Sequence, residues 1–213
     1  MMLAGEFSQV ARIDIPRKSI YRLSIYQRCL SRLRENDVDT VSSEALAKAA
    51  GVKPTQLRKD LTYFGQFGTR GLGYNVDVLS ATIAEVLGQN HLQPVILVGV
   101  GNLGSALLRY GGFKKEGFEV AAAFDIAPRT QLGLSIPILH LSEMAAFIKE
   151  RQVKMAILTV PASSAQLVTN QIVEAGIQAI LNFSPTVLDV PENVVVNSVD
   201  LAVELENLSY FIR

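Results

Sequence analysis

The sequence predicts an α/β protein in two parts, a small helical domain that ends in a β-hairpin and a doubly wound parallel sheet. Two short amphipathic helices meet at a tight turn near residue 51, and strand-like and helix-like segments alternate from residue 93 onward. Residues 1–75 hold 12 Lys or Arg and 7 Asp or Glu, a net charge of +5, whereas residues 76–213 hold 8 and 13, or −5. The asymmetry indicates two modules with different partners, although surface charge that merely segregates would give the same numbers.

Composition excludes several classes of protein. Apolar residues make up 49% of the chain, which is enough for a sizeable core. No apolar run approaches the roughly 20 residues that cross a bilayer, and the first residues lack the apolar core of a signal peptide. Cys29 alone builds no disulfide framework, and with only His91 and His140 beside it a zinc site is not expected. We therefore expect a cytoplasmic protein without a metal and without a membrane segment.

The first predicted helix covers about residues 16–34. Four apolar residues recur at intervals that fit one helical face, and five basic residues occupy much of the remaining surface. The apolar positions are Ile20, Leu23, Leu30 and Leu33, and the basic positions are Arg17, Lys18, Arg22, Arg28 and Arg32.

The next two helices have the pattern of a helix-turn-helix. Ser42 is a suitable N-cap for the second helix and Gly51 ends it. Pro54 suits the first position of a third helix, because its missing N–H is no loss there. Leu57 and Leu61 then follow at helical spacing. Two helices joined by so short a turn have the pattern of the motif whose second helix enters the major groove of DNA, although many helical hairpins with this pattern bind nothing.

The third helix and the glycine-rich segment after it are the expected DNA contacts. The helix carries a polar, basic surface. Residues 64–74, FGQFGTRGLGY, alternate aromatic and small residues, which suits a short β-hairpin, or wing, whose arginine reaches phosphates or a narrow minor groove. A flexible interdomain loop is the alternative, but a linker seldom needs so many rings. The residues expected to contact DNA are Ser43, Gln56, Arg58, Lys59, Tyr63, Thr69 and Arg70.

The second part opens with a dinucleotide-binding pattern. An apolar strand at 94–98 leads into Gly99-Val100-Gly101-Asn102-Leu103-Gly104, a helix begins near Asn102, and the strand EVAAAFD ends at Asp125. In such a Rossmann-type unit the glycines permit a tight turn, approach of a pyrophosphate and close helix packing, and the helix N-terminus attracts the phosphates. Asp125 would accept hydrogen bonds from the ribose and repel a 2′-phosphate, which favours NAD(H) over NADP(H). A purely structural glycine turn is the alternative.

Alternation continues after Asp125 and implies a parallel sheet. The loops after two later strands should meet the ligand at the carboxyl edge of the sheet, and ordinary turn chemistry explains them equally well. These loops are Thr159-Val160-Pro161 and Asn182-Phe183-Ser184-Pro185. The last segment places apolar residues on one helical face, which covers either its own core or a partner subunit. Those residues are Leu201, Leu205, Leu208 and Ile212.

Catalysis is not expected. A dehydrogenase needs a proton donor or acceptor beside the nicotinamide, and neither His91 nor His140 stands in a pattern that supplies one. The nucleotide would then be the ligand and the signal. Two alternatives remain: an NAD-dependent oxidoreductase with an accessory N-terminal domain, and a module that binds another nucleotide such as coenzyme A.

Taken together, QLRKDLTYFGQFGTRGLGY, GVGNLG with Asp125, LTVP and NFSP closely resemble the Rex family of bacterial redox-sensing transcriptional repressors. The resemblance covers nearly the whole chain from about Ile15. It implies a homodimer that binds palindromic operator DNA, exchanges its C-terminal helix between subunits, and is released from DNA by NADH as an effector that is not consumed. It also implies a polar network of Arg28, Tyr110 and the partner's Asp200. Some members place an aromatic residue after that Asp, near the nicotinamide, where this sequence has Leu201.

The predicted division of the chain follows from these motifs. A winged helix-turn-helix domain covers residues 1–78, and a connecting helix and linker cover 79–92. A Rossmann NAD(H)-binding domain covers 93–197, and a C-terminal dimerisation helix covers 198–213.

Overall fold

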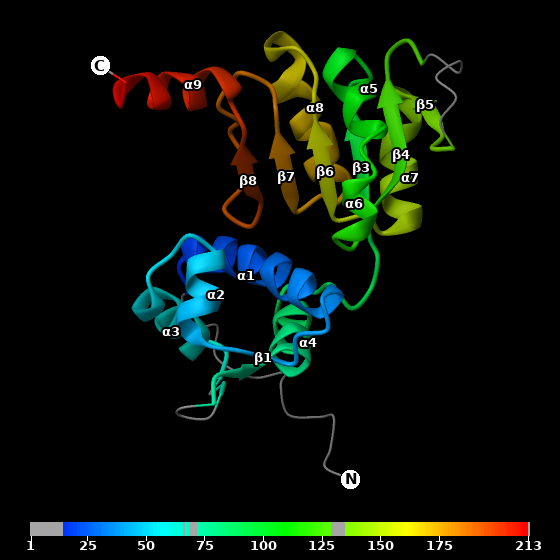
Figure 1. The fold of residues 1–213 in the computed structure, drawn as a ribbon. Helices are drawn as coiled ribbons and strands as arrows, with labels where there is room; N and C mark the ends of the chain where they lie inside the picture. Colours follow the sequence, from blue (N-terminus) through cyan, green and yellow to red (C-terminus); the bar gives the residue numbers. More distant parts are fainter. Residues whose placement is uncertain (1–14, 66, 69–71, 129–134, 213) are drawn as a thin grey trace. The chain divides into compact units, whose positions relative to one another are not determined.

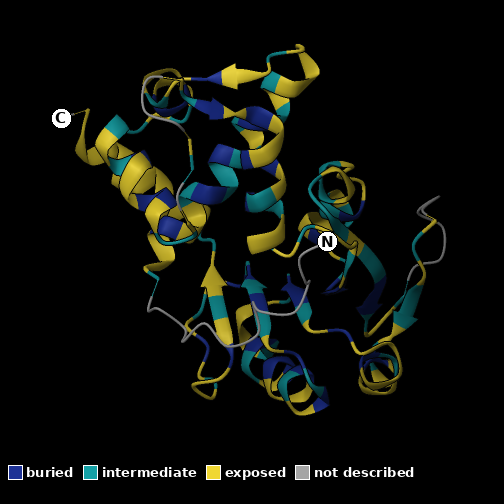
Figure 2. Cartoon of the chain, turned by 90° about the horizontal axis from the view of Figure 1, so that it is seen from below, coloured by how far each residue is buried: buried dark blue, intermediate teal, exposed yellow. Residues whose placement is uncertain are grey.

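The computed structural model describes residues 15–65, 67–68, 72–128 and 135–212. The chain forms two compact units, Met1–His91 and Leu92–Arg213. Each unit has hydrophobic clusters of its own, and many of the helices present one buried side and one exposed side (Figure 2).

Local sequence signals set the helix bounds of the first unit. Its elements are α1 (Arg17–Glu35), β1 (Thr40–Val41), α2 (Ser43–Ala49), α3 (Pro54–Thr62), β2 (Tyr74–Asn75) and α4 (Val76–Val86). The Ser42 side chain accepts a hydrogen bond from the Ala45 N–H at 3.0 Å and so caps α2. Gly51 follows α2 with a φ of +67°, and Pro54 occupies the first turn of α3. The predicted helix-turn-helix is therefore confirmed.

Helix α4 packs inside the first unit. Its Val76, Leu79 and Ile83 are buried in the same cluster as Leu23 and Leu30 of α1. Residues 79–92 are predicted as a connection between domains. The apolar face of α4 instead completes the core of the first unit, and the division between the units falls after His91.

The glycine-rich segment returns to a strand that precedes α2. Strand β2 pairs antiparallel with β1, with Val41 opposite Tyr74, a partner that the sequence analysis does not identify. Gly68 has a φ of +82°, and a Cβ at that position would lie 2.7 Å from the Gly73 carbonyl oxygen. The backbone at Gly68 therefore lies close to Gly73, within the predicted wing. The expected DNA contacts Thr69 and Arg70 lie outside the described residues.

The second unit contains the predicted parallel sheet. Its strands are β3 (Gln93–Val98), β4 (Phe118–Asp125), β5 (Ile138–His140), β6 (Met155–Leu158), β7 (Ala179–Asn182) and β8 (Val195–Ser198). They lie side by side in the order β5-β4-β3-β6-β7-β8, and every neighbouring pair is parallel (Figure 1). The doubly wound prediction is confirmed. The sequence does not predict the edge strand β8, because this short and mostly exposed strand lacks a buried apolar run.

Helices cover both faces of the sheet. The helical elements of this unit are α5 (Asn102–Leu108), α6 (Gly112–Lys115), η2 (Leu141–Glu143), α7 (Met144–Arg151), α8 (Ala162–Ala175) and α9 (Leu201–Tyr210). Ile96 of β3 packs with Met144 and Ile172 from α7 and α8. The adjacent residue Leu97 packs with Leu108 of α5 and with the partly buried Phe113 of α6. Successive strand residues thus serve opposite layers, as the pleat requires.

Helix α9 leaves its apolar side chains exposed. None of its described residues is buried, and Leu205 and Leu208 are 68% and 63% exposed. Of the two roles that the sequence analysis left open, covering the core of its own chain is therefore excluded for this helix. Exchange with a partner subunit stays a prediction. Across the described residues, no helix combines the length and the apolar character needed to cross a bilayer.

Candidate nucleotide site and DNA-binding helix

The expected nucleotide-binding loops gather at one edge of the sheet. Strands β3, β4, β6 and β7 are parallel neighbours, so their carboxyl ends lie side by side. The segments at these strand ends are 99–104, 125–127, 159–161 and 182–185, and they include every residue predicted to bind NAD(H).

The three glycines of the GVGNLG loop serve two different purposes. Gly99 has a φ of +97°, and a Cβ there would lie 2.8 Å from the Thr159 carbonyl oxygen. A Cβ on Gly104, inside α5, would collide with the Gly99 carbonyl oxygen. At Gly101, by contrast, no described atom lies within 4 Å of an added Cβ. Two glycines therefore allow close packing, and the third leaves open space where a phosphate can approach the backbone.

Asp125 lies at the end of β4 and is already hydrogen-bonded to the glycine-rich loop. Its Oδ2 accepts from the Val100 N–H at 2.7 Å, and its Oδ1 accepts from the Ala127 N–H at 2.9 Å. An ionised carboxylate has about four acceptor sites, so two remain for ribose hydroxyls. The residue is only partly buried. The geometry fits the predicted role of this acid.

Three polar side chains connect the neighbouring loops. Thr159 Oγ1 donates to the Gly99 carbonyl at 2.6 Å, and Ser184 Oγ donates to the Val160 carbonyl at 2.6 Å. The fully buried Asn182 accepts from the Ser184 N–H at 2.9 Å and donates to Ser198 Oγ at 3.2 Å. These contacts give Thr159, Asn182 and Ser184 a definite structural role in shaping the edge. Contact of this edge with the nicotinamide stays a prediction.

The residues of the expected interdomain network lie on two different units. The Tyr110 side chain is 60% exposed, and its ring stacks edge-on against Phe113 with centroids 5.1 Å apart. Asp200 caps α9, accepting from the Ala202 N–H at 2.9 Å, and Leu201 beside it is exposed. Arg28 lies on α1 of the first unit. A network between Arg28, Tyr110 and a partner's Asp200 stays a prediction.

The outer face of α3 presents the expected basic residues. Arg58 and Lys59 are exposed, whereas Tyr63 is half-buried. Arg58 Nη1 donates to Ser43 Oγ at 2.7 Å and lies 3.3 Å from Glu44 Oε1. The start of α2 and the middle of α3 therefore hold this guanidinium at the surface of the helix-turn-helix.

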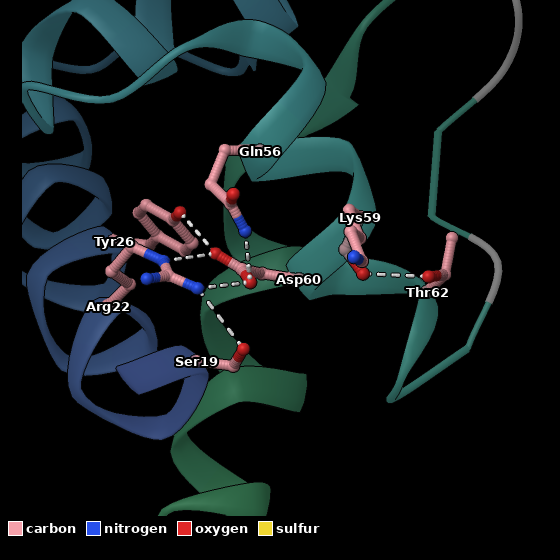
Figure 3. Close-up of polar contacts among 7 residues, drawn as sticks. All are labelled: Ser19, Arg22, Tyr26, Gln56, Lys59, Asp60 and Thr62. Atoms are coloured by element: carbon pink, nitrogen blue, oxygen red, sulfur yellow. Dashed lines mark hydrogen bonds and ion pairs between the residues drawn. The ribbon is translucent and has the colours of Figure 1, made fainter. Parts of the chain in front are cut away.

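Beneath that face lies a buried polar cluster that the sequence analysis does not identify (Figure 3). The Asp60 carboxylate is 0% exposed and accepts four hydrogen bonds. Arg22 Nε and Nη2 donate to its two oxygens at 2.6 and 2.7 Å, Tyr26 Oη donates at 2.8 Å, and Gln56 Nε2 donates at 2.9 Å. Arg22 Nη2 also donates to Ser19 Oγ at 3.1 Å. We call these five side chains the Asp60 cluster.

Two interpretations from the sequence are corrected here. Arg22 was expected on the outer surface of the first helix, but its side chain is only 21% exposed because it reaches Asp60. Gln56 is expected on the outer side of the third helix, but it is half-buried and its amide nitrogen donates to Asp60; contact of Gln56 with DNA stays a prediction. One feature of the sequence indicates that Asp60 is buried, because it lies on the same helical face as Leu57 and Leu61.

The cluster holds an ion pair. Burial opposes ionisation of Asp60, but the hydrogen bonds from Arg22, Tyr26 and Gln56 outweigh it and lower the pKa of the carboxyl. Burial, together with the hydrogen bond to Asp60, raises the pKa of the Tyr26 phenol. The hydrogen bond to Asp60 also raises the pKa of Arg22, against an opposing effect of burial.

Comparison with known proteins finds two different family models in the two parts of the chain. A family model described as a CoA binding domain matches residues 90–186, and one described as a putative DNA-binding protein N-terminus matches residues 14–62. The redox-sensing transcriptional repressor Rex of Syntrophobacter fumaroxidans is 50% identical over 200 residues, covering 92% of this chain and 95% of that protein. The Rex repressor of Streptomyces coelicolor is 46% identical over 198 residues, covering 92% of this chain and 77% of that protein.

Solved structures of RSP share the fold of nearly the whole chain. The crystal structure of RSP in complex with β-NAD⁺ and operator DNA superposes with a TM-score of 0.86 at 36% identity, covering 93% of this chain and 92% of that chain. The structure of RSP in complex with β-NADH superposes with a TM-score of 0.81 at 35% identity, covering 93% and 94%.

Proposed function

This chain belongs to the Rex family of redox-sensing transcriptional repressors, and on that basis we propose that it binds operator DNA and leaves it when NADH accumulates. Its effectors are NADH and NAD⁺, and its partner is double-stranded operator DNA, as the complexes of RSP indicate. The observation that carries the proposal is the presence, in one chain, of a helix-turn-helix with exposed basic residues and a glycine-rich loop open at Gly101. A repressor of this kind acts in the cytoplasm, and the nucleotide is sensed without being consumed.

The nucleotide would lie along the carboxyl edge of the sheet. The pyrophosphate approaches the backbone at Gly101, where a side chain would fill the space it needs. Asp125 accepts hydrogen bonds from the adenosine ribose and disfavours a 2′-phosphate. The nicotinamide then extends toward residues 159–161 and 182–185. NADH and NAD⁺ differ by one hydride and one charge, so the contacts that discriminate them must lie at that end.

Release from DNA requires that this difference reach the helix-turn-helix. A homodimer places two recognition helices on a palindrome with half-sites one helical turn, or a multiple of it, apart. The exposed apolar residues of α9 supply a surface for the partner subunit. Arg28, Tyr110 and the partner's Asp200 would link the nucleotide-binding unit to the first helix. A change in the angle between subunits would then spoil the half-site spacing.

Two alternative functions are less well supported. An NAD-dependent oxidoreductase would need a proton donor, and the exposed His140 instead caps η2 through Ser142. Coenzyme A is suggested by the description of one family model, but the solved relatives hold NAD⁺ and NADH. Asp125→Ala separates the cases, because it should weaken NADH binding and leave coenzyme A binding, if there is any, unchanged.

The direct test is a binding titration on a labelled palindromic operator duplex, followed by fluorescence anisotropy. We expect saturating NADH to lower the affinity for the operator and saturating NAD⁺ to preserve it. Equal operator affinity with the two nucleotides would contradict the proposal. Turnover of NADH with a small carbonyl compound would favour the oxidoreductase.

A further inference from the structure

We propose that Asp60 is a positioning residue for DNA recognition, which fixes the rotation of α3 on α1 and thereby the direction of the reading face. The inference rests on the proposed function, because it concerns the same DNA-binding helix. Asp60 itself faces the interior and contacts no DNA. It would act through Arg58 and Lys59, which lie on the outer side of the same helix.

The contacts of the Asp60 cluster join two helices that are distant in sequence. Arg22 and Tyr26 come from α1, while Asp60 and Gln56 come from α3 (Figure 3). The guanidinium meets both carboxylate oxygens with a parallel pair of hydrogen bonds, at 2.6 and 2.7 Å. A bidentate pair of this kind fixes orientation as well as distance, because both bonds weaken when either partner turns.

Stability alone does not account for such a cluster. Removing a carboxylate and a guanidinium from water has a large free-energy cost, and well-packed apolar residues in place of a buried ion pair are often neutral or stabilising. Leu57 and Leu61 already bury the apolar face of α3. Apolar contacts have little directional preference, so they hold α3 against the core without fixing its rotation. The polar cluster supplies the missing directional constraint.

A small rotation is enough to disturb recognition. An α-helix with its side chains has a radius of about 5–6 Å, so a turn of about 10° moves a side-chain end by about 1 Å. Hydrogen bonds to base edges occupy a range of only about 0.5 Å, roughly 2.7–3.2 Å between N and O. Contacts to phosphates tolerate more movement, because long basic side chains can follow them. Loss of the cluster should therefore reduce specificity more than general affinity for DNA.

The test replaces the charged members of the cluster together. The triple variant Arg22→Met, Tyr26→Phe, Asp60→Leu removes both charges and the phenol and keeps the interior apolar. Affinity is measured for the operator duplex and for a scrambled duplex of equal length, each over a series of salt concentrations. The affinity for NADH shows whether the second unit still binds its ligand, and the melting temperature shows whether the protein is folded.

We expect the ratio of operator affinity to scrambled-duplex affinity to fall by about 5- to 150-fold, the discrimination typical of one mismatched base pair. The salt dependence should stay unchanged, since no phosphate contact is removed, and NADH affinity should equal that of the natural protein. An equal fall for both duplexes, with the ratio preserved, would mean that the cluster only stabilises the fold. A shallower salt dependence would mean that Arg22 contacts phosphate directly. Either result overturns the proposal.

A milder variant decides the question if the triple variant does not fold. Tyr26→Phe removes one hydrogen bond to Asp60 and keeps the ion pair, and Tyr21→Phe on the same helix is its control because Tyr21 is 71% exposed. Tyr26→Phe should lower the affinity ratio and Tyr21→Phe should not. An unchanged ratio for Tyr26→Phe would overturn the proposal. If the natural protein itself showed no operator preference, the proposed function would fail instead, so the two failures are distinguishable.

Discussion

Replacing Gly101 by alanine separates ligand binding from folding in the nucleotide-binding unit. Gly101 has a φ of −75° and a ψ of −159°, an extended conformation open to any residue, and no described atom lies within 4 Å of the added Cβ. The unliganded protein should therefore keep its stability or gain about 0.4–1 kcal/mol from a less flexible unfolded chain. The new methyl group instead occupies the space through which the pyrophosphate reaches the backbone.

The expected loss of affinity follows from that contact. A phosphate oxygen bonded to a backbone N–H lies about 2.7–3.2 Å from the nitrogen, and the methyl group forces it outward. Loss of one hydrogen bond to a charged group removes about 1.5–3 kcal/mol, or roughly 10- to 150-fold in the dissociation constant. Isothermal titration calorimetry measures the dissociation constant of NADH directly. The method needs no intrinsic tryptophan, which this chain lacks.

Gly104→Ala is the matched comparison. Its Cβ would collide with the Gly99 carbonyl oxygen and lie 3.0 Å from Thr159 Oγ1. Overpacking of this kind costs about 1–3 kcal/mol, and each kcal/mol lowers the melting temperature by on the order of 4 °C. We therefore expect Gly104→Ala to melt earlier and Gly101→Ala to melt normally but bind NADH weakly. Normal NADH affinity in Gly101→Ala would refute the placement of the pyrophosphate at this loop.

Three further outcomes concern the first unit. Arg58→Ala and Lys59→Ala should each weaken DNA binding and reduce the slope of its salt dependence by about one; unchanged slopes would move the phosphate contacts elsewhere. Ser42→Ala removes the acceptor of the Ala45 N–H and should lower the stability of this unit by about 0.5–2 kcal/mol in urea denaturation, whereas an unchanged midpoint would show that the cap contributes nothing. The pKa of Asp60 is lowered on folding from its ordinary 3.8, so its contribution to stability is present above about pH 4 and is lost as pH falls through the folded value. In an Asp60→Asn variant, the free energy of unfolding should lack this loss on acidification. An identical pH dependence of the free energy of unfolding in the two proteins would argue against the ion pair.

Local chemistry was sufficient to predict the helix-turn-helix and the parallel sheet. Ser42, Gly51 and Pro54 each determine a helix end through their own backbone or side chain, so the sequence shows them directly. The spacing of the glycines at 99, 101 and 104 likewise shows a dinucleotide-binding loop directly, although the close approach of Gly99 to Thr159 appears only in the structure. The helix ends and the loop pattern can therefore be read without knowledge of distant contacts.

Contacts between distant segments could not be predicted in the same way. Arg22 precedes Asp60 by 38 residues, and in the sequence it is indistinguishable from the other arginines of its helix. Strand β2 pairs with β1, from which α2 and α3 separate it in the sequence. Helix α4 completes the core of the first unit through residues that would equally suit a connecting helix. Each depends on how elements pack after they form, for which periodicity gives only the buried face.

Under the proposed function one chain couples nucleotide redox state to DNA binding, and coupling between two sites is reciprocal. The most direct measurement is the dissociation constant of NADH with and without saturating operator duplex, with a scrambled duplex as the control. Operator DNA should weaken NADH binding by the same factor by which NADH weakens operator binding, and the scrambled duplex should have a smaller effect. An NADH affinity that is identical in the presence and absence of operator would mean that the two sites are not coupled.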